Sequence, residues 1–318
     1  MTAVAESPSA PLSEAEFHEL EQVVAKRNKP KLRPARVGLH AFLILVAILW
    51  LVPITAAFYN SFRFYESDTL ANGPFAPPAE LTTENYTDAW RVGDMGTTLR
   101  NTAIIVLPSL FFILLLSSML AFACTRFSWR FNIAFLVLFT AGNLLPQQVM
   151  FQPLFQIFDR TPWPDWLSGG QNNGVLLGTQ ASVILTHIAF QTGFCTFVLA
   201  NYMKTIPKDL SEAAAVDGAS VPRQFFQVIL PLTRPALAAL ATLEFTWLYN
   251  DFFWGSVLLN QGDQRPITSS IAVLNGQYAT DFNLIAAASL IIAMPTLLVY
   301  LMLQKQFIGG LTLGSTKG

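Results

Sequence analysis

Residues 207–220 read PKDLSEAAAVDGAS and connect two long apolar runs. Pro207 suits the first turn of a helix, and the acids Asp209 and Glu212 suit the positive end of the helix dipole. The alanines that follow are strong helix formers, and Gly218 accepts the left-handed conformation that ends a helix. The serine that closes the stretch can cap a second helix. The stretch therefore predicts a short helix, a sharp turn and a second helix.

The apolar runs on both sides are long enough to cross a membrane. A spanning helix needs about 20 mostly apolar residues, because the hydrocarbon core is about 30 Å thick. Apolar residues make up 53% of the chain and charged residues only 12%, whereas a soluble domain carries about 25% charged residues. We predict an all-α polytopic membrane protein with six transmembrane helices. The spans are expected at about 38–62, 101–125, 131–157, 181–203, 235–259 and 282–304.

Polar segments complete the predicted organisation. A tail, 1–36, precedes a membrane domain, 37–306, whose loop 205–234 joins spans four and five, and a second tail covers 307–318. In the first tail, Ser13 and Glu16 have the spacing of a capping box, which favours a short amphipathic helix. The alternative is a partly disordered tail whose basic residues only set the topology.

Lysines and arginines are distributed unevenly between the connecting segments. With the N-terminus placed inside, the inner segments hold 14 of the 19 basic residues and the outer segments hold 5. Positive residues collect on the cytoplasmic side of membrane proteins. Both termini and residues 207–220 are therefore expected in the cytoplasm.

Three motifs in and around the loop resemble a known family. Glu212-Ala213-Ala214, Asp217-Gly218-Ala219 and Ile229-Leu230-Pro231-Leu232 are similar to the EAA signature of binding-protein-dependent ABC importer permeases. Elsewhere, Pro146-Gln147-Gln148-Val149 and Asn250-Asp251-Phe252 resemble the sugar-importing branch, which includes MalG-type maltose permease subunits. The chain has Tyr249 where that branch usually has Trp. The first tail and the Pro-rich stretch 73–78 have no counterpart in the resemblance.

The resemblance implies a function and a set of partners. The loop would form a cytoplasmic coupling helix between helices 4 and 5, gripped by an ATP-hydrolysing subunit. The partners would be a second permease, identical or homologous, two ATP-binding-cassette ATPase subunits, and an extracellular or periplasmic solute-binding protein. The setting would be the lipid bilayer of a bacterial or archaeal plasma membrane. The residues that would couple to the ATPase are Glu212, Ala213, Ala214, Asp217 and Gly218.

Motifs for independent chemistry are missing from the sequence. None of the seven lysines follows a glycine, so the chain has no phosphate-binding Gly-Lys-[Ser/Thr] sequence. His-Glu-x-x-His and Gly-x-Ser-x-Gly are also absent, and Cys124 and Cys195 have neither metal-site nor disulfide spacing. We expect no enzyme activity, no metal site, no nucleic-acid partner and no cofactor bound by this chain. ATP and Mg would be used by the partner ATPase.

Polar residues inside the predicted spans are candidates for the solute pathway. Ionisable groups in a span cost roughly 2.5–3.5 kcal/mol and tend to face protein or water. Glu244 and Asp251 are seven residues apart, so a continuous helix would place both on one face, toward the pore or a partner subunit. Asp251 could instead be solvated or paired with a partner's basic residue. His187 could line the pathway or be a packing residue. The pathway candidates are Gln148, Glu244, Tyr249, Asn250 and Asp251, while the neighbouring amides Asn143, Gln147 and Gln152 are expected mainly to join helices.

Three functions remain open on the sequence. The first is a permease subunit of a sugar importer, with di- or oligosaccharides favoured and glycerol phosphate or a polyol as neighbours. The second is an ion-coupled carrier working alone, which would need an inverted repeat and a buried ion site. The third is a scaffold within a membrane complex.

Overall fold

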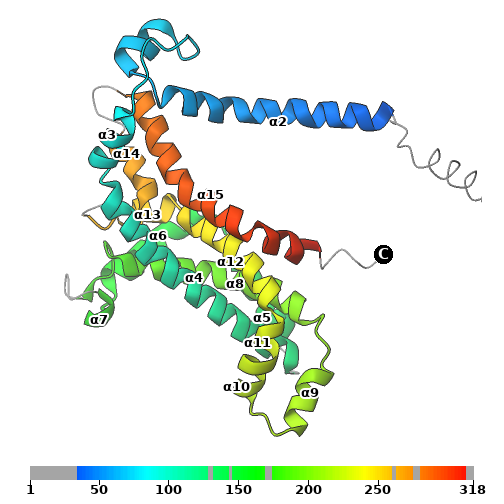
Figure 1. The fold of residues 1–318 in the computed structure, drawn as a ribbon. Coiled ribbons are helices and arrows are strands. Elements are labelled where there is room, and N and C mark those ends of the chain that lie inside the picture. The colour runs from blue at the N-terminus through cyan, green and yellow to red at the C-terminus, as the bar shows by residue number, and fades with distance from the viewer. Residues whose placement is uncertain are drawn as a thin grey trace, which may run out of the picture. The chain divides into compact units, whose positions relative to one another are not determined.

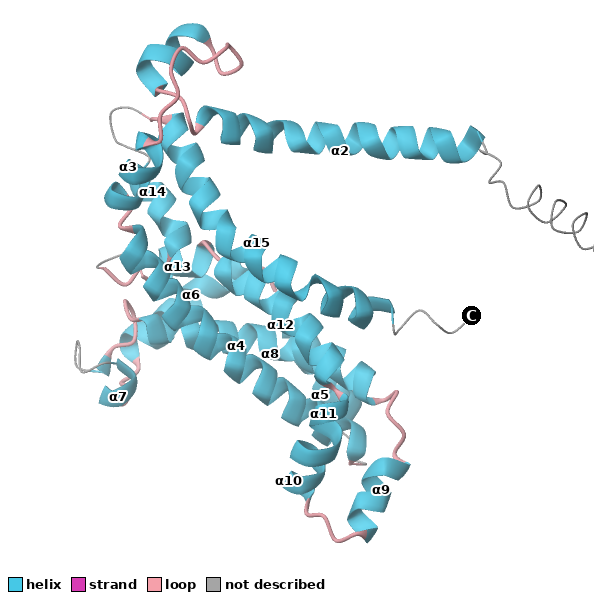
Figure 2. Cartoon of the chain, viewed as in Figure 1, coloured by secondary structure: helices cyan, strands magenta, loops and turns pink. Residues whose placement is uncertain are grey.

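The computed structural model describes residues 34–127, 132–142, 145–168, 174–259, 263–274 and 280–312. Within these ranges every regular element is helical, and Arg63 and Leu81 form an isolated antiparallel bridge. The all-α membrane fold expected from the sequence is confirmed (Figures 1 and 2). The helix expected near Ser13 and the side chain of Asn143 lie outside the described residues.

Four helices are individually long and apolar enough to cross a membrane. Each consists of a mostly apolar run with few charges, as the bilayer requires. They are α2 (Pro34–Asn60), α4 (Met95–Arg126), α8 (Gln180–Met203) and α15 (Phe282–Thr312).

Two further spans are bent pairs of helices. The axes of α5 (Asn132–Gly142) and α6 (Gln147–Arg160) meet at 96°. The segment Val221–Leu232 meets α12 (Arg234–Tyr249) at 74°. Counting each pair as one span gives six spans in the described part of the chain, the number expected from the charge-free runs.

The fifth span differs from the continuous helix expected over 235–259. Helix α12 ends at Tyr249, and Asn250 and Asp251 precede the separate helix α13 (Phe253–Leu258). Because the helix stops between Glu244 and Asp251, their spacing of seven does not place them on a common face. The expectation for that pair is therefore wrong.

The short elements lie mainly at the ends of the spans. In Figure 1, α3 and α9 lie near opposite ends of α4, so the segments around them are separated by the length of that helix. The short elements are η1 (Tyr65–Leu70), α3 (Glu84–Val92), α7 (Asp165–Ser168), α9 (Asp209–Val216), α10 (Val221–Arg223), η3 (Gln224–Ile229), α11 (Leu230–Leu232), η4 (Ile267–Ser269) and α14 (Ser270–Leu274).

Helices α4 and α8 form the centre of the core. Small buried residues let the two backbones approach, as is typical of helices in a membrane. The hydroxyl of Ser117 donates to the carbonyl oxygen of Thr192 over 3.2 Å and so connects the two helices. Helices α12 and α15 pack beside them, and the main core includes Ile113, Leu199, Leu240, Leu248 and Ile292.

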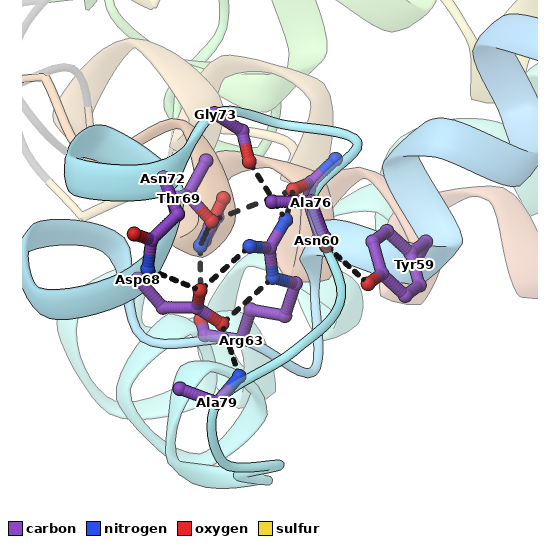
Figure 3. Close-up of polar contacts among 10 residues, drawn as sticks. Tyr59, Asn60, Arg63, Asp68, Thr69, Asn72, Gly73, Ala76 and Ala79 are labelled. Carbon is purple, nitrogen blue, oxygen red and sulfur yellow. Dashed lines mark hydrogen bonds and ion pairs between the residues drawn. The ribbon is translucent and has the colours of Figure 1, made fainter.

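A buried ion pair organises the segment that follows α2. Two nitrogens of Arg63 donate to Asp68, Nε to Oδ2 over 2.8 Å and Nη2 to Oδ1 over 2.7 Å (Figure 3). Both side chains are almost fully buried. The hydrogen bonds from Arg63 hold the pKa of Asp68 well below its usual range, and the same pair raises the pKa of Arg63.

The same ion pair holds the Pro-rich stretch 73–78 in place. Nη1 of Arg63 donates to the carbonyl oxygen of Gly73 over 3.2 Å, and the backbone N–H of Ala79 donates to Asp68 over 3.2 Å. The Tyr59 hydroxyl donates to the carbonyl oxygen of Ala76 over 2.6 Å (Figure 3). A stretch without a counterpart in the family resemblance is therefore fixed by Arg63 and Tyr59, with Asp68 holding the residue that follows it.

Two asparagines connect this network to other helices. The amide of Asn283, at the start of α15, donates to the carbonyl oxygen of Arg63 over 2.9 Å and to the Thr69 hydroxyl over 2.7 Å. The amide of Asn85, in α3, donates to the same Arg63 carbonyl oxygen over 2.9 Å. Amide donors shared in this way keep buried carbonyl groups satisfied.

Candidate functional site

The loop between spans four and five folds as a helix with a defined end. Helix α9 carries Asp209 and Glu212 in its first turn, while Pro207 lies just before the N-cap residue and not within the helix. At its other end Gly218 has a φ of +78°. The backbone N–H of Ala219 donates to the carbonyl oxygen of Ala214 over 2.9 Å, the long hydrogen bond of a Schellman motif.

The tip of this loop is exposed and its base is fixed. Glu212 and Gly218 are exposed, and Val216 is 89% exposed although it is apolar. At the base, Nη2 of Arg126 donates to the carbonyl oxygens of Met203 and Ile206 over 3.2 and 3.1 Å. An exposed apolar and acidic helix on a rigid base is typical of a docking element.

The candidate coupling residues lie together on this helix and its turn. Glu212, Ala213, Asp217 and Gly218 are exposed, and Ala214 is half-buried. Ser220 is the N-cap residue of α10, as expected, but its side chain makes no capping hydrogen bond. The carbonyl oxygen of Ser220 accepts the Gln224 N–H over 2.9 Å instead.

A second candidate site is a cavity of about 600 Å³ that we call the polar pocket. This volume is within the range of small-molecule sites. Three helices and the break after α12 contribute its walls. Its lining residues are Gln147 from α6, His187, Gln191 and Phe194 from α8, Trp247 from α12, and Asn250 and Asp251 from the break.

Asp251 is held in the polar pocket by the backbone around it. Its carboxylate accepts the N–H of Gly255 over 3.2 Å, and its carbonyl oxygen accepts the hydroxyl of Thr268 over 2.7 Å. The Nε2 atom of His187 lies 3.8 Å from Asp251 Oδ2 and has no hydrogen-bond partner among the described residues. The pocket therefore contains a fixed carboxylate beside a buried imidazole whose Nε2 has no described partner.

The opposite side of the polar pocket is aromatic. The rings of Phe194 and Trp247 lie 5.4 Å apart at 47°, and the Trp247 side chain is half exposed. Flat aromatic faces beside the amides of Gln147, Gln191 and Asn250 match the two surfaces of a sugar ring, which has apolar C–H faces and a hydroxyl rim.

The predicted pathway residues separate into two groups. Asn250 and Asp251 line the polar pocket, and Gln148 is exposed on α6 next to the lining residue Gln147. Glu244 is completely buried inside the chain, and Tyr249 is 4% exposed and donates its hydroxyl to the carbonyl oxygen of Ile292 over 3.0 Å. The last two are packing residues in this structure.

Sequence reasoning missed Gln191 and Phe194. Their spacing from His187, four and seven residues, places all three on one face of α8. This spacing in the sequence could have indicated that the three residues line a common surface. Among the described residues no group of three His, Cys, Asp or Glu side chains is arranged to hold a metal ion.

Comparison with known proteins gives consistent matches. Residues 113–308 match the family model described as "Binding-protein-dependent transport system inner membrane component". The chain is 32% identical to the diacetylchitobiose uptake system permease protein NgcG of Streptomyces coelicolor, over 87% of each chain. It is 31% identical to the probable ABC transporter permease protein PH1036 of Pyrococcus horikoshii, over 84% of this chain and 92% of the relative.

A solved structure supports the fold. The crystal structure of a bacterial ABC transporter involved in the import of the acidic polysaccharide alginate contains a chain that aligns with a TM-score of 0.66 and 20% identity. The alignment covers 88% of this chain and all of the other. At this level of identity the likeness concerns the arrangement of the helices.

Proposed function

Since the chain belongs to the family of binding-protein-dependent transport system inner membrane components, we propose that it forms half of the solute pathway of an ATP-driven sugar importer. The observation that carries the proposal is the exposed helix α9 on its rigid base. The transporter would contain two ATPase subunits, which use ATP and Mg. One of them would bind this helix. A second permease would supply the other half of the pathway.

The polar pocket is the proposed point of contact with the solute. Aromatic faces next to amide side chains suit a sugar, and the related NgcG is named for diacetylchitobiose uptake. A di- or oligosaccharide is therefore the favoured solute. An extracellular or periplasmic binding protein would deliver it, which agrees with the description of the family.

A face of α8 supports a route from this pocket toward α9. A groove of about 330 Å³ between α5 and α8 is lined by Phe197, Asn201 and Lys204 among others. Asn201 lies seven residues beyond Phe194, so it shares the face of α8 that lines the polar pocket. Closure of the ATPases would move α9 and expose this face alternately to the two sides of the membrane.

The proposed orientation places α9 and both termini in the cytoplasm. The excess of basic residues on that side supports it. The segment around Arg63 and α3 would then be outside, on the side of the binding protein. The setting would be the plasma membrane of a bacterium or archaeon, since the two named relatives come from Streptomyces coelicolor and Pyrococcus horikoshii.

The test is charge reversal on α9 in the assembled importer. Glu212→Lys should abolish solute uptake and loosen ATPase co-purification, because it reverses the exposed charge in the first turn of α9. The matched control is Glu84→Lys, since Glu84 is also exposed in the first turn of a helix, α3, near the other end of α4. Normal uptake and normal ATPase recovery with Glu212→Lys would contradict the proposal.

Two other functions predict different results. An ion-coupled carrier would take up solute in vesicles that contain this chain and lack an ATPase. A scaffold subunit would lose assembly after substitution of α9, yet a stable assembly with Glu212→Lys would transport normally. Loss of uptake from a correctly assembled complex is expected only for the importer.

A further inference from the structure

We infer that Asp251 makes the polar pocket selective by charge, so that it admits neutral sugars and rejects solutes bearing a carboxylate or phosphate. The inference rests on the proposed function and deepens it, because it chooses among the solutes that the sequence left open. It excludes uronic acids and phosphate esters such as glycerol phosphate from the favoured substrates.

The charge distribution in the pocket lining carries the inference. The lining contains the carboxylate of Asp251, three amides, two aromatic rings and the imidazole of His187. No lysine or arginine lines it in the part of the chain that the structure describes. A carboxylate or phosphate entering the pocket would therefore meet a like charge and no compensating cation from this chain.

The carboxylate has no freedom to turn away from a solute. It accepts the N–H groups of Trp254 and Gly255 over 3.5 and 3.2 Å. The side chain is 12% exposed, so water screens it only partly. A like charge brought close to it is therefore repelled more strongly than it would be in bulk water.

Neutral sugars have no such obstacle. A sugar hydroxyl can donate to the carboxylate of Asp251, whose side chain is 12% exposed. The amides of Gln191 and Asn250 supply both donors and acceptors. The pocket can therefore hydrogen-bond a neutral sugar without burying an unpaired charge.

The test measures the electrostatic potential at the pocket with thiol reagents of different charge. Asn250→Cys places a thiol next to Asp251 on the exposed side of the lining, and Gln191→Cys places one on the opposite helix. The whole importer is treated with cationic, neutral and anionic methanethiosulfonates at mildly alkaline pH. Modification of this chain is followed by its intact mass, with the unsubstituted chain as the background for Cys124 and Cys195.

The thiol should be modified fastest by the cationic reagent, more slowly by the neutral reagent and slowest by the anionic reagent. The ratio of cationic to anionic rates, divided by the same ratio for a small free thiol in solution, should be about tenfold or more, as expected for one charge a few ångströms away. Adding Asp251→Asn should bring the ratio close to one, while Asp88→Asn, far along the sequence on α3, should leave it unchanged. The neutral reagent shows whether each variant keeps the pocket accessible.

Two outcomes would overturn the inference. Relative to the free thiol, equal rates for the two charged reagents would mean that another subunit neutralises Asp251, and a faster anionic reagent would mean that the pocket is positive. Either result would show that the pocket does not select solutes by charge. If Glu212→Lys nevertheless loses uptake, the proposed importer function still stands. The labelling requires no transport, so it gives its answer even if the chain is not an importer.

Discussion

The thiol of Cys195 donates a hydrogen bond to Oε1 of Glu244 over 3.1 Å, and this contact joins α8 to α12 inside the core. The second carboxyl oxygen of Glu244 has no partner among the described residues, and both side chains are completely buried. Among the described residues, the buried carboxyl group of Glu244 therefore depends on one weak donor.

Removing that donor should destabilise the protein. Removing both partners should recover part of the lost stability. Cys195→Ala leaves Glu244 without a described partner, at a cost of about 1–3 kcal/mol. Replacing Glu244 by Leu in the same chain removes the unsatisfied group. Thermal unfolding of the purified importer measures both. A double variant less stable than Cys195→Ala alone would contradict this account.

The Arg63–Asp68 pair predicts a loss of stability in acid. The pKa of Asp68 is lower in the folded chain than in the unfolded chain, so the unfolded state binds the proton first. The stabilisation by the pair is complete when the pH is above the pKa of Asp68 in the unfolded chain, which is about 4. It is lost progressively as the pH falls below that pKa.

Asp68→Asn provides the comparison. Its unfolding midpoint should lie below that of the natural chain at neutral pH, and the difference should shrink as the pH falls below about 4. Asp88→Asn is the control, because the Asp88–Arg91 pair is exposed and contributes little. A difference that stays constant down to acid pH would show that the Asp68 charge is unimportant.

Gly218 is predicted to be needed for its backbone conformation. Its φ is +78°, and a Cβ added there would meet nothing within 4 Å, so a substitution costs backbone strain of about 1–2 kcal/mol and no steric clash. Uptake should decrease in the order Gly218→Asn, Gly218→Ala, Gly218→Val, since asparagine tolerates this conformation best. Gly96→Ala, also in open space but with ordinary φ, is the control. Equal uptake by all three would contradict the prediction.

Trp247 is predicted to contact the solute through its exposed ring. Trp247→Ala should lower the uptake rate by about two- to tenfold, because aromatic contacts contribute about 0.5–1.5 kcal/mol beyond the buried area. Trp247→Phe keeps an aromatic face and should retain most of the rate. Uptake at saturating binding protein is the measurement. Trp166→Ala on α7, where the side chain is 82% exposed, controls for loss of a tryptophan elsewhere.

The amino-acid sequence alone determined the features that depend on neighbours in the chain. The helix at Asp209–Val216 and its left-handed glycine could be predicted because they rest on hydrogen bonds between residues at most five apart. The number of spans could be predicted because the bilayer demands long apolar runs.

Only the tertiary structure decided which polar residues meet. Glu244 and Asp251 looked equivalent by spacing, yet the end of α12 at Tyr249 leaves one in the core and the other in the polar pocket. That pocket unites Gln147, His187 and Trp247 from three helices. Spacing within one helix shows which residues share a face, but the packing of other helices decides whether that face is buried or open.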